Sequence, residues 1–198
     1  MKIRIIDYKA GNSGSVLHAV EHLGFEAKCV KSPAELEGAS HIILPGVGTA
    51  RATMDNLREL GFIDALSEAV LDKKTPFLGI CIGLQLLFER SEEGDTPCLG
   101  WLKGEVKRFD ASAVRVPQMG WNYVSFTKNS PVKAKEGHYY FVNSYHARPA
   151  CDGDLWAVSD YGGKFTAAVW HENIFATQFH AEKSGQLGLE LLKGFLSL

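Results

Sequence analysis

Short apolar runs alternate with stretches of mixed apolar and polar residues through the first hundred positions. Four apolar runs predict strands, at residues 3–6, 25–30, 41–44 and 77–80. The stretches between them predict helices, at residues 12–23, 49–71 with a break near Gly61, and 82–89. Gly11-Asn12-Ser13-Gly14 predicts a tight turn with Asn12 capping the first of these helices. Runs that are apolar throughout are typical of strands buried on both faces. The first half therefore predicts a parallel sheet with crossover helices.

After about residue 100 the pattern becomes that of antiparallel strands. Aromatic and β-branched residues between turn residues predict strands at 103–109, 122–127, 138–145, 155–159 and 165–171. Gly162-Gly163 is a hairpin signal, and Ser184 is the expected N-cap of a helix over 184–198 that follows a strand at 174–178. We expect one domain over residues 1–198 with a flavodoxin-like α/β fold. Its open mixed sheet would have a parallel core flanked by helices and additional antiparallel strands in the second half.

Composition narrows the functional classes. The 198 residues carry a formal net charge of −2 without long runs of one sign, which argues against nucleic acid or an anionic membrane as a partner. No stretch approaches the roughly 20 apolar residues of a membrane-spanning helix. Four cysteines lie far apart without a Cys-x-x-Cys pair, a pattern typical of free thiols in a reducing compartment. We expect a soluble cytoplasmic protein.

A metal-like pattern occurs in the first helical stretch. His18, Glu21 and His22 match a zinc-peptidase spacing, yet they lie on the face opposite the apolar residues of that stretch. The preferred interpretation is a solvated helix face. We expect neither a metal site nor a cofactor.

The strongest chemical signal is Gly79-Ile80-Cys81-Ile82-Gly83, which follows the fourth apolar run. A Gly-x-nucleophile-x-Gly sequence between a strand and a helix is typical of a nucleophile elbow, here with cysteine as the nucleophile. Small residues two positions either side let neighbouring backbone approach the turn. A cysteine reacts as its thiolate, and the N-terminus of the following helix would favour that form.

A candidate base and its orienting carboxylate lie about one hundred residues later. His180 and Glu182 follow the apolar strand at 174–178 and are two residues apart, so on an extended segment they project to the same side. Glu182 would hold the imidazole of His180 in the orientation that thiolate attack on a carbonyl carbon requires. Cys81, His180 and Glu182 are therefore the candidate catalytic residues.

Acyl transfer also needs donors for a developing oxyanion. The backbone N–H of Ile82, directly after the nucleophile, is one candidate. Val47 and Gly48, in the Pro45-Gly46-Val47-Gly48 turn after the third strand, are the others, because flanking glycines let a backbone amide rotate. An ordinary strand-to-helix turn is the alternative interpretation of that sequence.

Several longer blocks carry a family resemblance. They are residues 6–8 with Gly11-Asn12, 44–48, 79–85, 117–122, 140–145 and 180–184. On these blocks, and over nearly its whole length, the chain resembles the class I glutamine amidotransferases. The elbow and the His-x-Glu pair are shared by that whole family. Met119-Gly120-Trp121-Asn122 and Glu182-Lys183-Ser184 resemble the branch that serves histidine biosynthesis.

The resemblance implies a reaction and a substrate. Cys81 would attack the carboxamide of L-glutamine, His180 would protonate the departing ammonia, and the thioester would be hydrolysed to glutamate. Four positions match or adjoin those that hold the amino-acid end of the substrate, namely Gln85, Glu93, Ser144 and Tyr145.

The resemblance also implies a partner. Ammonia is useful only as the neutral molecule, so it would pass directly to a (β/α)8-barrel cyclase subunit, in a heterodimer. Met119, Trp121, Tyr140 and Lys183 lie in blocks that resemble the family's interface with that barrel, and aromatic and methionine side chains suit an interface core. The alternative is that these side chains fill the protein's own core.

Some positions depart from the family pattern. Ala181 stands where proline is usual, Asn143 where histidine is common, and Lys9 where glycine is customary, while 12–15 also differ. These changes leave open a glutaminase of a different synthase, such as a surface-sugar paralogue. A cysteine-elbow hydrolase or deglycase and a catalytically idle partner subunit are the remaining alternatives, and the intact His-x-Glu pair argues against both.

Overall fold

The computed structural model describes residues 1–9 and 12–198. Nine strands form one sheet in the order β2 (Ala27–Val30), β1 (Ile3–Ile6), β3 (His41–Leu44), β4 (Phe77–Ile80), β13 (Ile174–Thr177), β12 (Lys164–His171), β11 (Leu155–Asp160), β8 (Gln118–Phe126) and β9 (Gly137–Asn143). The first five run parallel to their neighbours, and the pairs from β13 to β9 are antiparallel. The expected mixed α/β sheet with a parallel core is therefore confirmed.

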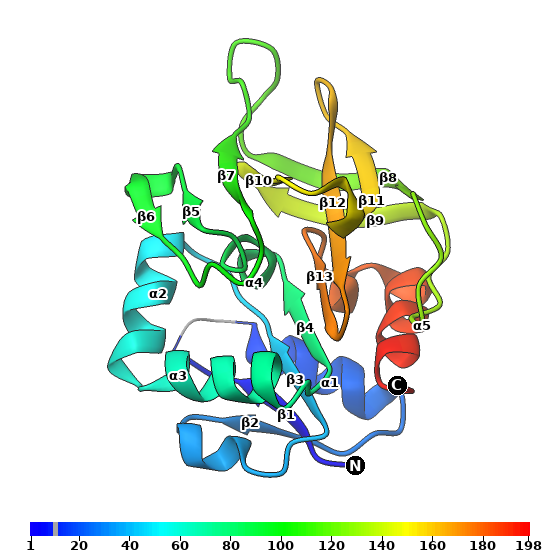
Figure 1. The fold of residues 1–198 in the computed structure, drawn as a ribbon. Helices are drawn as coiled ribbons and strands as arrows, with labels where there is room; N and C mark the ends of the chain where they lie inside the picture. Colours follow the sequence, from blue (N-terminus) through cyan, green and yellow to red (C-terminus); the bar gives the residue numbers. More distant parts are fainter. Residues whose placement is uncertain (10–11) are drawn as a thin grey trace.

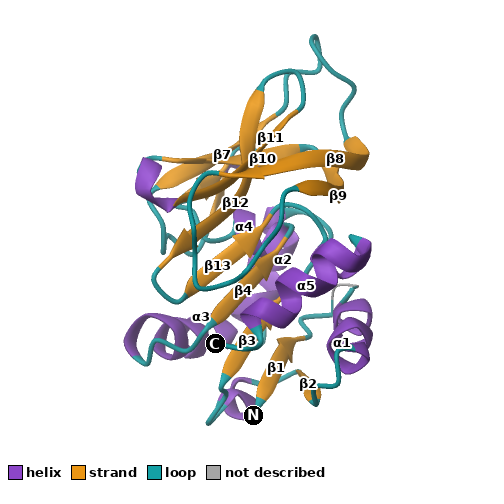
Figure 2. Ribbon diagram, turned by 90° about the vertical axis from the view of Figure 1, so that its right-hand side faces the viewer, coloured by secondary structure: helices purple, strands orange, loops and turns teal. Residues whose placement is uncertain are grey.

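Five α-helices cover the parallel part on both faces (Figures 1 and 2). They are α1 (Ser13–His22), α2 (Ala50–Glu59), α3 (Phe62–Ser67), α4 (Ile82–Gln85) and α5 (Gly185–Phe195). Residues of α1 and α5 pack into one hydrophobic core, and residues of α2 and α3 pack into another. Neighbouring residues of one strand divide between the two cores: Ile5 faces the first and Ile6 the second. This division explains the continuous apolar runs, because residues on both faces of these strands are buried.

A smaller second sheet lies beside the carboxyl ends of the parallel strands (Figure 1). Its strands are β10 (Tyr145–Pro149), β7 (Gly104–Arg108), β5 (Arg90–Ser91) and β6 (Thr96–Pro97). Single turns complete the chain: η1 (Pro33–Leu36), η2 (Glu68–Asp72), η3 (Glu93–Asp95), η4 (Asp152–Asp154) and η5 (Ala181–Lys183). The strand expected over 138–145 is in fact two, because the chain leaves β9 at Ser144 and enters the second sheet as β10.

Other element boundaries also differ from expectation. The helix after Cys81 ends at Gln85 rather than residue 89, because the carbonyls of Leu86, Leu87 and Phe88 accept hydrogen bonds from Leu99, Leu102 and Gly100 instead. The strand expected to begin at 122 begins at Gln118, where β8 pairs with β9. The Gly162-Gly163 turn does join two strands, β11 and β12.

Two expected helix caps are wrong. Ser184 precedes α5, but its hydroxyl donates to the carbonyl of His180 (2.6 Å) and accepts from the N–H of Tyr140 (3.0 Å). Asn12 precedes α1 without capping it, since its side chain contacts Glu182. Gly11, part of the same expected turn, lies outside the described residues. Both polar side chains thus serve the segment around His180 rather than the helix that follows them.

Two expected absences concern membranes and metals. None of the helices in the described ranges is long and apolar enough to cross a bilayer. His18, Glu21 and His22 are exposed on α1, and no cluster of metal-ligating side chains occurs among the residues that the structure describes.

Candidate active site

Cys81 lies at the turn between β4 and α4 with φ of 57°, a left-handed conformation rare for a residue with a side chain. Its N–H donates to the carbonyl of Thr177 on β13 (2.7 Å), which fixes the turn to the neighbouring strand. A β-carbon at Gly79 would lie 2.5 Å from the carbonyl oxygen of Gly83, and one at Gly83 would lie 2.1 Å from that of Leu44. Both glycines are therefore required by close backbone packing.

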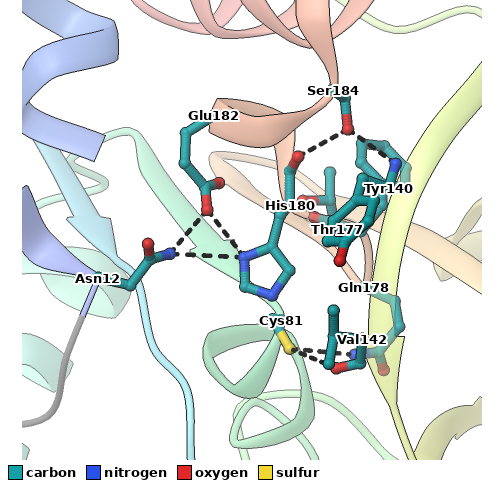
Figure 3. Close-up of polar contacts among 10 residues, drawn as sticks. Asn12, Cys81, Tyr140, Val142, Thr177, Gln178, His180, Glu182 and Ser184 are labelled. Atoms are coloured by element: carbon teal, nitrogen blue, oxygen red, sulfur yellow. Dashed lines mark hydrogen bonds and ion pairs between the residues drawn. The ribbon is translucent and has the colours of Figure 1, made fainter. Parts of the chain in front are cut away.

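His180 and Glu182 form a buried pair behind the cysteine. The Nδ1 of His180 lies 2.8 Å from the Oε1 of Glu182, and the two side chains are 1% and 0% exposed. The Asn12 side-chain N–H₂ donates to the same carboxylate oxygen (2.7 Å) (Figure 3). The same-side argument assumed an extended chain, but the chain enters the single turn η5 after His180. This turn brings the carboxylate of Glu182 back to the Nδ1 of His180.

Each member of this pair changes the pKa of the other. Burial alone would favour neutral His180, but its contacts with Cys81 and Glu182 outweigh burial and raise its pKa to about 9. Burial would also favour a protonated Glu182, yet hydrogen bonds from His180 and Asn12 lower its pKa below the usual value. The arrangement therefore holds a protonated His180 ring against the ionised carboxylate of Glu182. The edge of the ring far from Glu182 can then interact with the sulfur of Cys81.

That far edge faces the thiol. In Figure 3 the ring of His180 lies between Glu182 and Cys81, with Nε2 on the side of the sulfur. Both residues line one cavity of about 320 Å³. The Sγ of Cys81 also lies 3.8 Å from the carbonyl oxygen of Val142 and 3.6 Å from the Nε2 of Gln178. The candidate nucleophile Cys81 therefore lies beside the candidate base His180, which in turn contacts its orienting carboxylate Glu182.

The same cavity gathers the other candidate residues. Besides Cys81 and His180 it is lined by Val47, Gly48, Ile82, Gln85, Glu93, Ser144, Tyr145 and Lys183. A larger cavity of about 590 Å³ lies elsewhere, against Phe109 and His146, and none of these residues lines it. We take the smaller cavity as the candidate site because Cys81 and His180 both line it.

Hydrogen bonds already hold two of the polar side chains that line the cavity, a carboxylate and an amide. The Oε2 of Glu93 accepts from the N–H of Ala50 (2.7 Å), at the start of α2 and close to the 45–48 turn. The Nε2 of Gln85 donates to the carbonyl of Tyr145 (3.0 Å) and to the Oε1 of Gln178 (3.0 Å). Such fixed acceptor groups can recognise the ammonium end of an amino acid.

The candidate oxyanion residues lie on either side of Cys81. Ile82 begins α4 and is buried, whereas the Val47 side chain is 40% exposed at the cavity wall. Gly48 has φ of 116°, a conformation that a residue with a side chain would adopt only under strain. Because α4 is a single turn, its N–H groups rather than a long-helix dipole would act on the sulfur.

The residues expected at a partner interface form a surface patch. Met119 and Trp121 project from the same face of β8 and are 67% and 56% exposed, so they do not fill the protein's own core. Tyr140 on β9 meets Trp121 edge to face at 5.9 Å between ring centroids. Lys183 is exposed at the cavity instead.

Sequence reasoning missed two residues that contact the catalytic group. Asn12 was expected only to cap a helix, and its contact with Glu182 spans 170 positions. Gln178 was counted as the end of a strand. A glutamine at the carboxyl end of an apolar strand, where α/β folds place their sites, was the available signal.

The family model "Glutamine amidotransferase class-I" matches residues 4–197. The chain belongs to the class I glutamine amidotransferase family. This confirms the family inferred from the sequence blocks.

Two HisH relatives of this amidotransferase are similar to it over their full length. It is 43% identical to the imidazole glycerol phosphate synthase subunit HisH of Leptospira interrogans, covering 99% of this chain and 100% of the relative. It is 45% identical to HisH 1 of Campylobacter jejuni strain RM1221, at the same coverage. An Arabidopsis thaliana relative, imidazole glycerol phosphate synthase hisHF, is 44% identical over 98% of this chain and 34% of its own.

A solved structure shows the same fold. A crystal structure of a glutamine amidotransferase matches with a TM-score of 0.78 at 22% identity, covering 98% of this chain and 97% of the other.

Proposed function

We propose that this amidotransferase is the glutaminase subunit of an imidazole glycerol phosphate synthase in histidine biosynthesis. The observation that carries the proposal is the cavity shared by Cys81 and His180, with Glu182 bonded to the imidazole behind it. Identity of 43% to 45% with HisH subunits over their full length supports the choice of pathway.

The reaction begins with attack of the Cys81 thiolate on the carboxamide carbon of glutamine. The carbon–nitrogen bond breaks, and the imidazolium of His180 gives its proton to the leaving nitrogen, which departs as ammonia. A water molecule then attacks the thioester while neutral His180 takes a proton from it. Glutamate leaves, and the thiolate is restored.

Glu182 keeps its charge throughout and holds His180 in position for both proton transfers. The N–H groups of Ile82 and of the Val47–Gly48 segment would stabilise the oxyanion of each tetrahedral intermediate. These groups come from two different loops, so the oxyanion site is complete only when the 45–48 turn presents an amide to the cavity.

Substrate recognition falls to the far side of the cavity. Gln85 and Glu93 line it together with Ser144 and Tyr145, and Glu93 offers a carboxylate to the substrate's ammonium group. No cofactor takes part in these steps.

Ammonia leaves toward a cyclase subunit with a (β/α)8 barrel, which uses it to make imidazole glycerol phosphate. The proposed contact is the patch formed by the exposed side chains of Met119 and Trp121 and the half-buried Tyr140, with Lys183 beside the cavity mouth. The patch is close to the chemistry because Val142, on the same strand as Tyr140, contacts the sulfur of Cys81. In the Arabidopsis relative the matching segment is about a third of a longer chain, as expected when two subunits are fused.

The experiment pairs a nucleophile variant with two nitrogen sources. In the complex with the cyclase subunit, Cys81→Ala should abolish synthesis from glutamine and leave synthesis from added ammonia unchanged. Cys151→Ala, at an exposed thiol outside the cavity, is the matched control and should retain both activities. Glutamine-driven synthesis by Cys81→Ala would refute the nucleophile assignment, and failure to assemble with the cyclase would refute the pathway.

A further inference from the structure

Gln178 is a buried amide that no step above uses. Its side chain has no solvent exposure, and it follows β13 two residues before His180. Its Nε2 lies 3.6 Å from the sulfur of Cys81, and its Oε1 accepts from the Nε2 of Gln85. Gln178 therefore touches the nucleophile on one side and a residue of the substrate cavity on the other.

The orientation of this amide is fixed by a backbone carbonyl. The carbonyl oxygen of Tyr145 can only accept, so the NH₂ group of Gln85 must turn toward it. The same NH₂ group then meets Gln178, which must present its oxygen there. The remaining end of the Gln178 amide, its NH₂ group, is thereby directed at the sulfur.

The sulfur needs such a donor once it loses its proton. As a thiol, Cys81 can donate to the carbonyl oxygen of Val142 at 3.8 Å. As a thiolate it has no proton to donate, and the same carbonyl dipole repels the negative charge. An N–H directed at the sulfur offsets that repulsion, because a hydrogen bond to an ionised acceptor is stronger than one to a neutral acceptor.

We propose that Gln178 is a positioning residue that stabilises the Cys81 thiolate and holds it toward the substrate carbon, with its donor end set by the relay from Tyr145 through Gln85. This assignment rests on the proposed function, since it gives Gln178 a task in thiolate attack on glutamine. The relay also joins substrate recognition to the nucleophile, because Gln85 lines the cavity and fixes the Gln178 amide.

The test measures the thiolate directly and does not depend on turnover. Reaction of Cys81 with iodoacetamide is followed as a function of pH by mass spectrometry of the Cys81 peptide. The variants are Gln178→Met, which removes the donor at similar length, and Gln178→Glu, which presents oxygen to the sulfur. Gln118→Met is the matched control: it also replaces a buried glutamine, at a position that does not contact Cys81.

We expect the pH midpoint of alkylation to move upward by about one unit in Gln178→Met, which is a tenfold lower rate at pH values below the wild-type midpoint. The midpoint in Gln178→Glu should move further, and that in Gln118→Met should match wild type. In steady-state assays, Gln178→Met should lower kcat with little change in KM for glutamine, because the side chain does not line the cavity.

Two results decide the proposal. An unchanged alkylation midpoint in folded Gln178→Met overturns it, and this variant decides alone if Gln178→Glu does not fold. If wild type neither hydrolyses glutamine nor assembles with a cyclase, the proposed function fails, whereas an upward shift in Gln178→Met still supports the link between this amide and the sulfur.

Discussion

Replacing Glu182 with glutamine tests the buried pair at nearly constant shape. Oε1 of Glu182 accepts from His180 and Asn12, whereas Oε2 is buried and has no hydrogen-bond partner among residues 1–9 and 12–198. The amide oxygen of glutamine can therefore keep both contacts, and its NH₂ group takes the place of Oε2. The substitution removes the charge while leaving the geometry of the ring largely intact.

The magnitude follows from the pKa of His180. The contacts with Cys81 and Glu182 raise that pKa to about 9 from the usual 6.5. Without the carboxylate charge, burial dominates and the pKa should fall by about two units, equivalent to about 2.7 kcal/mol. With the pKa lowered from about 9 to about 7, the protonated fraction of His180 falls about twofold at pH 7 and about tenfold at pH 8. We therefore expect kcat/KM for glutamine to fall about tenfold at pH 8.

The assay has two readouts. Glutamate release gives kcat/KM, and NMR titration of the imidazole gives the pKa of His180. Glu172→Gln is the control, since it also removes a paired carboxylate, but at an exposed contact with Lys74. The reasoning would be refuted if Glu182→Gln kept at least half of the wild-type rate at pH 8, or if the pKa of His180 stayed near 9.

Three further predictions address the fold, the pH dependence and the partner patch. Gly83→Ala places a β-carbon 2.1 Å from the carbonyl oxygen of Leu44 and should lower both Tm and activity, whereas Gly14→Ala, with open space around it, should leave both unchanged; equal thermal melts would contradict this. Because the pKa of His180 is raised from 6.5 to about 9, its protonation stabilises the fold fully below pH 6.5. We expect this contribution, about 3 kcal/mol at most, to be lost between pH 6.5 and 9 in wild type but not in His180→Asn, and denaturant titrations with parallel pH dependence would disprove it. Trp121→Ala removes a 56% exposed side chain, so it should weaken affinity for the cyclase subunit tenfold or more with Tm unchanged, and calorimetry giving wild-type affinity would argue against the patch.

Local sequence patterns were sufficient to predict the parallel core of the sheet and the elbow at Cys81. The strand at Phe77–Ile80 could be predicted because strands buried on both faces are apolar throughout. The elbow could be predicted because Gly79 and Gly83 let neighbouring backbone approach to distances at which a β-carbon would clash. These features depend on a few neighbouring residues, so the sequence carries them directly.

Contacts between distant segments were not readable in the same way. Asn12 and Ser184 have the residue types of helix caps, and each precedes a helix, yet tertiary contacts with Glu182 and Tyr140 occupy their side chains. The four-residue length of α4 depends on Leu99, Gly100 and Leu102 donating to carbonyls that a longer helix would use. Such competition depends on the assembled fold rather than on propensity.

The most direct measurement of the central claim, that Cys81 is the nucleophile paired with His180, is mapping of covalent labelling by a chloroketone analogue of glutamine. Peptide mass spectrometry should place the label on Cys81 and not on Cys29, Cys98 or Cys151, at a rate reduced in His180→Asn. Label on another cysteine, or an unchanged rate in His180→Asn, would contradict it.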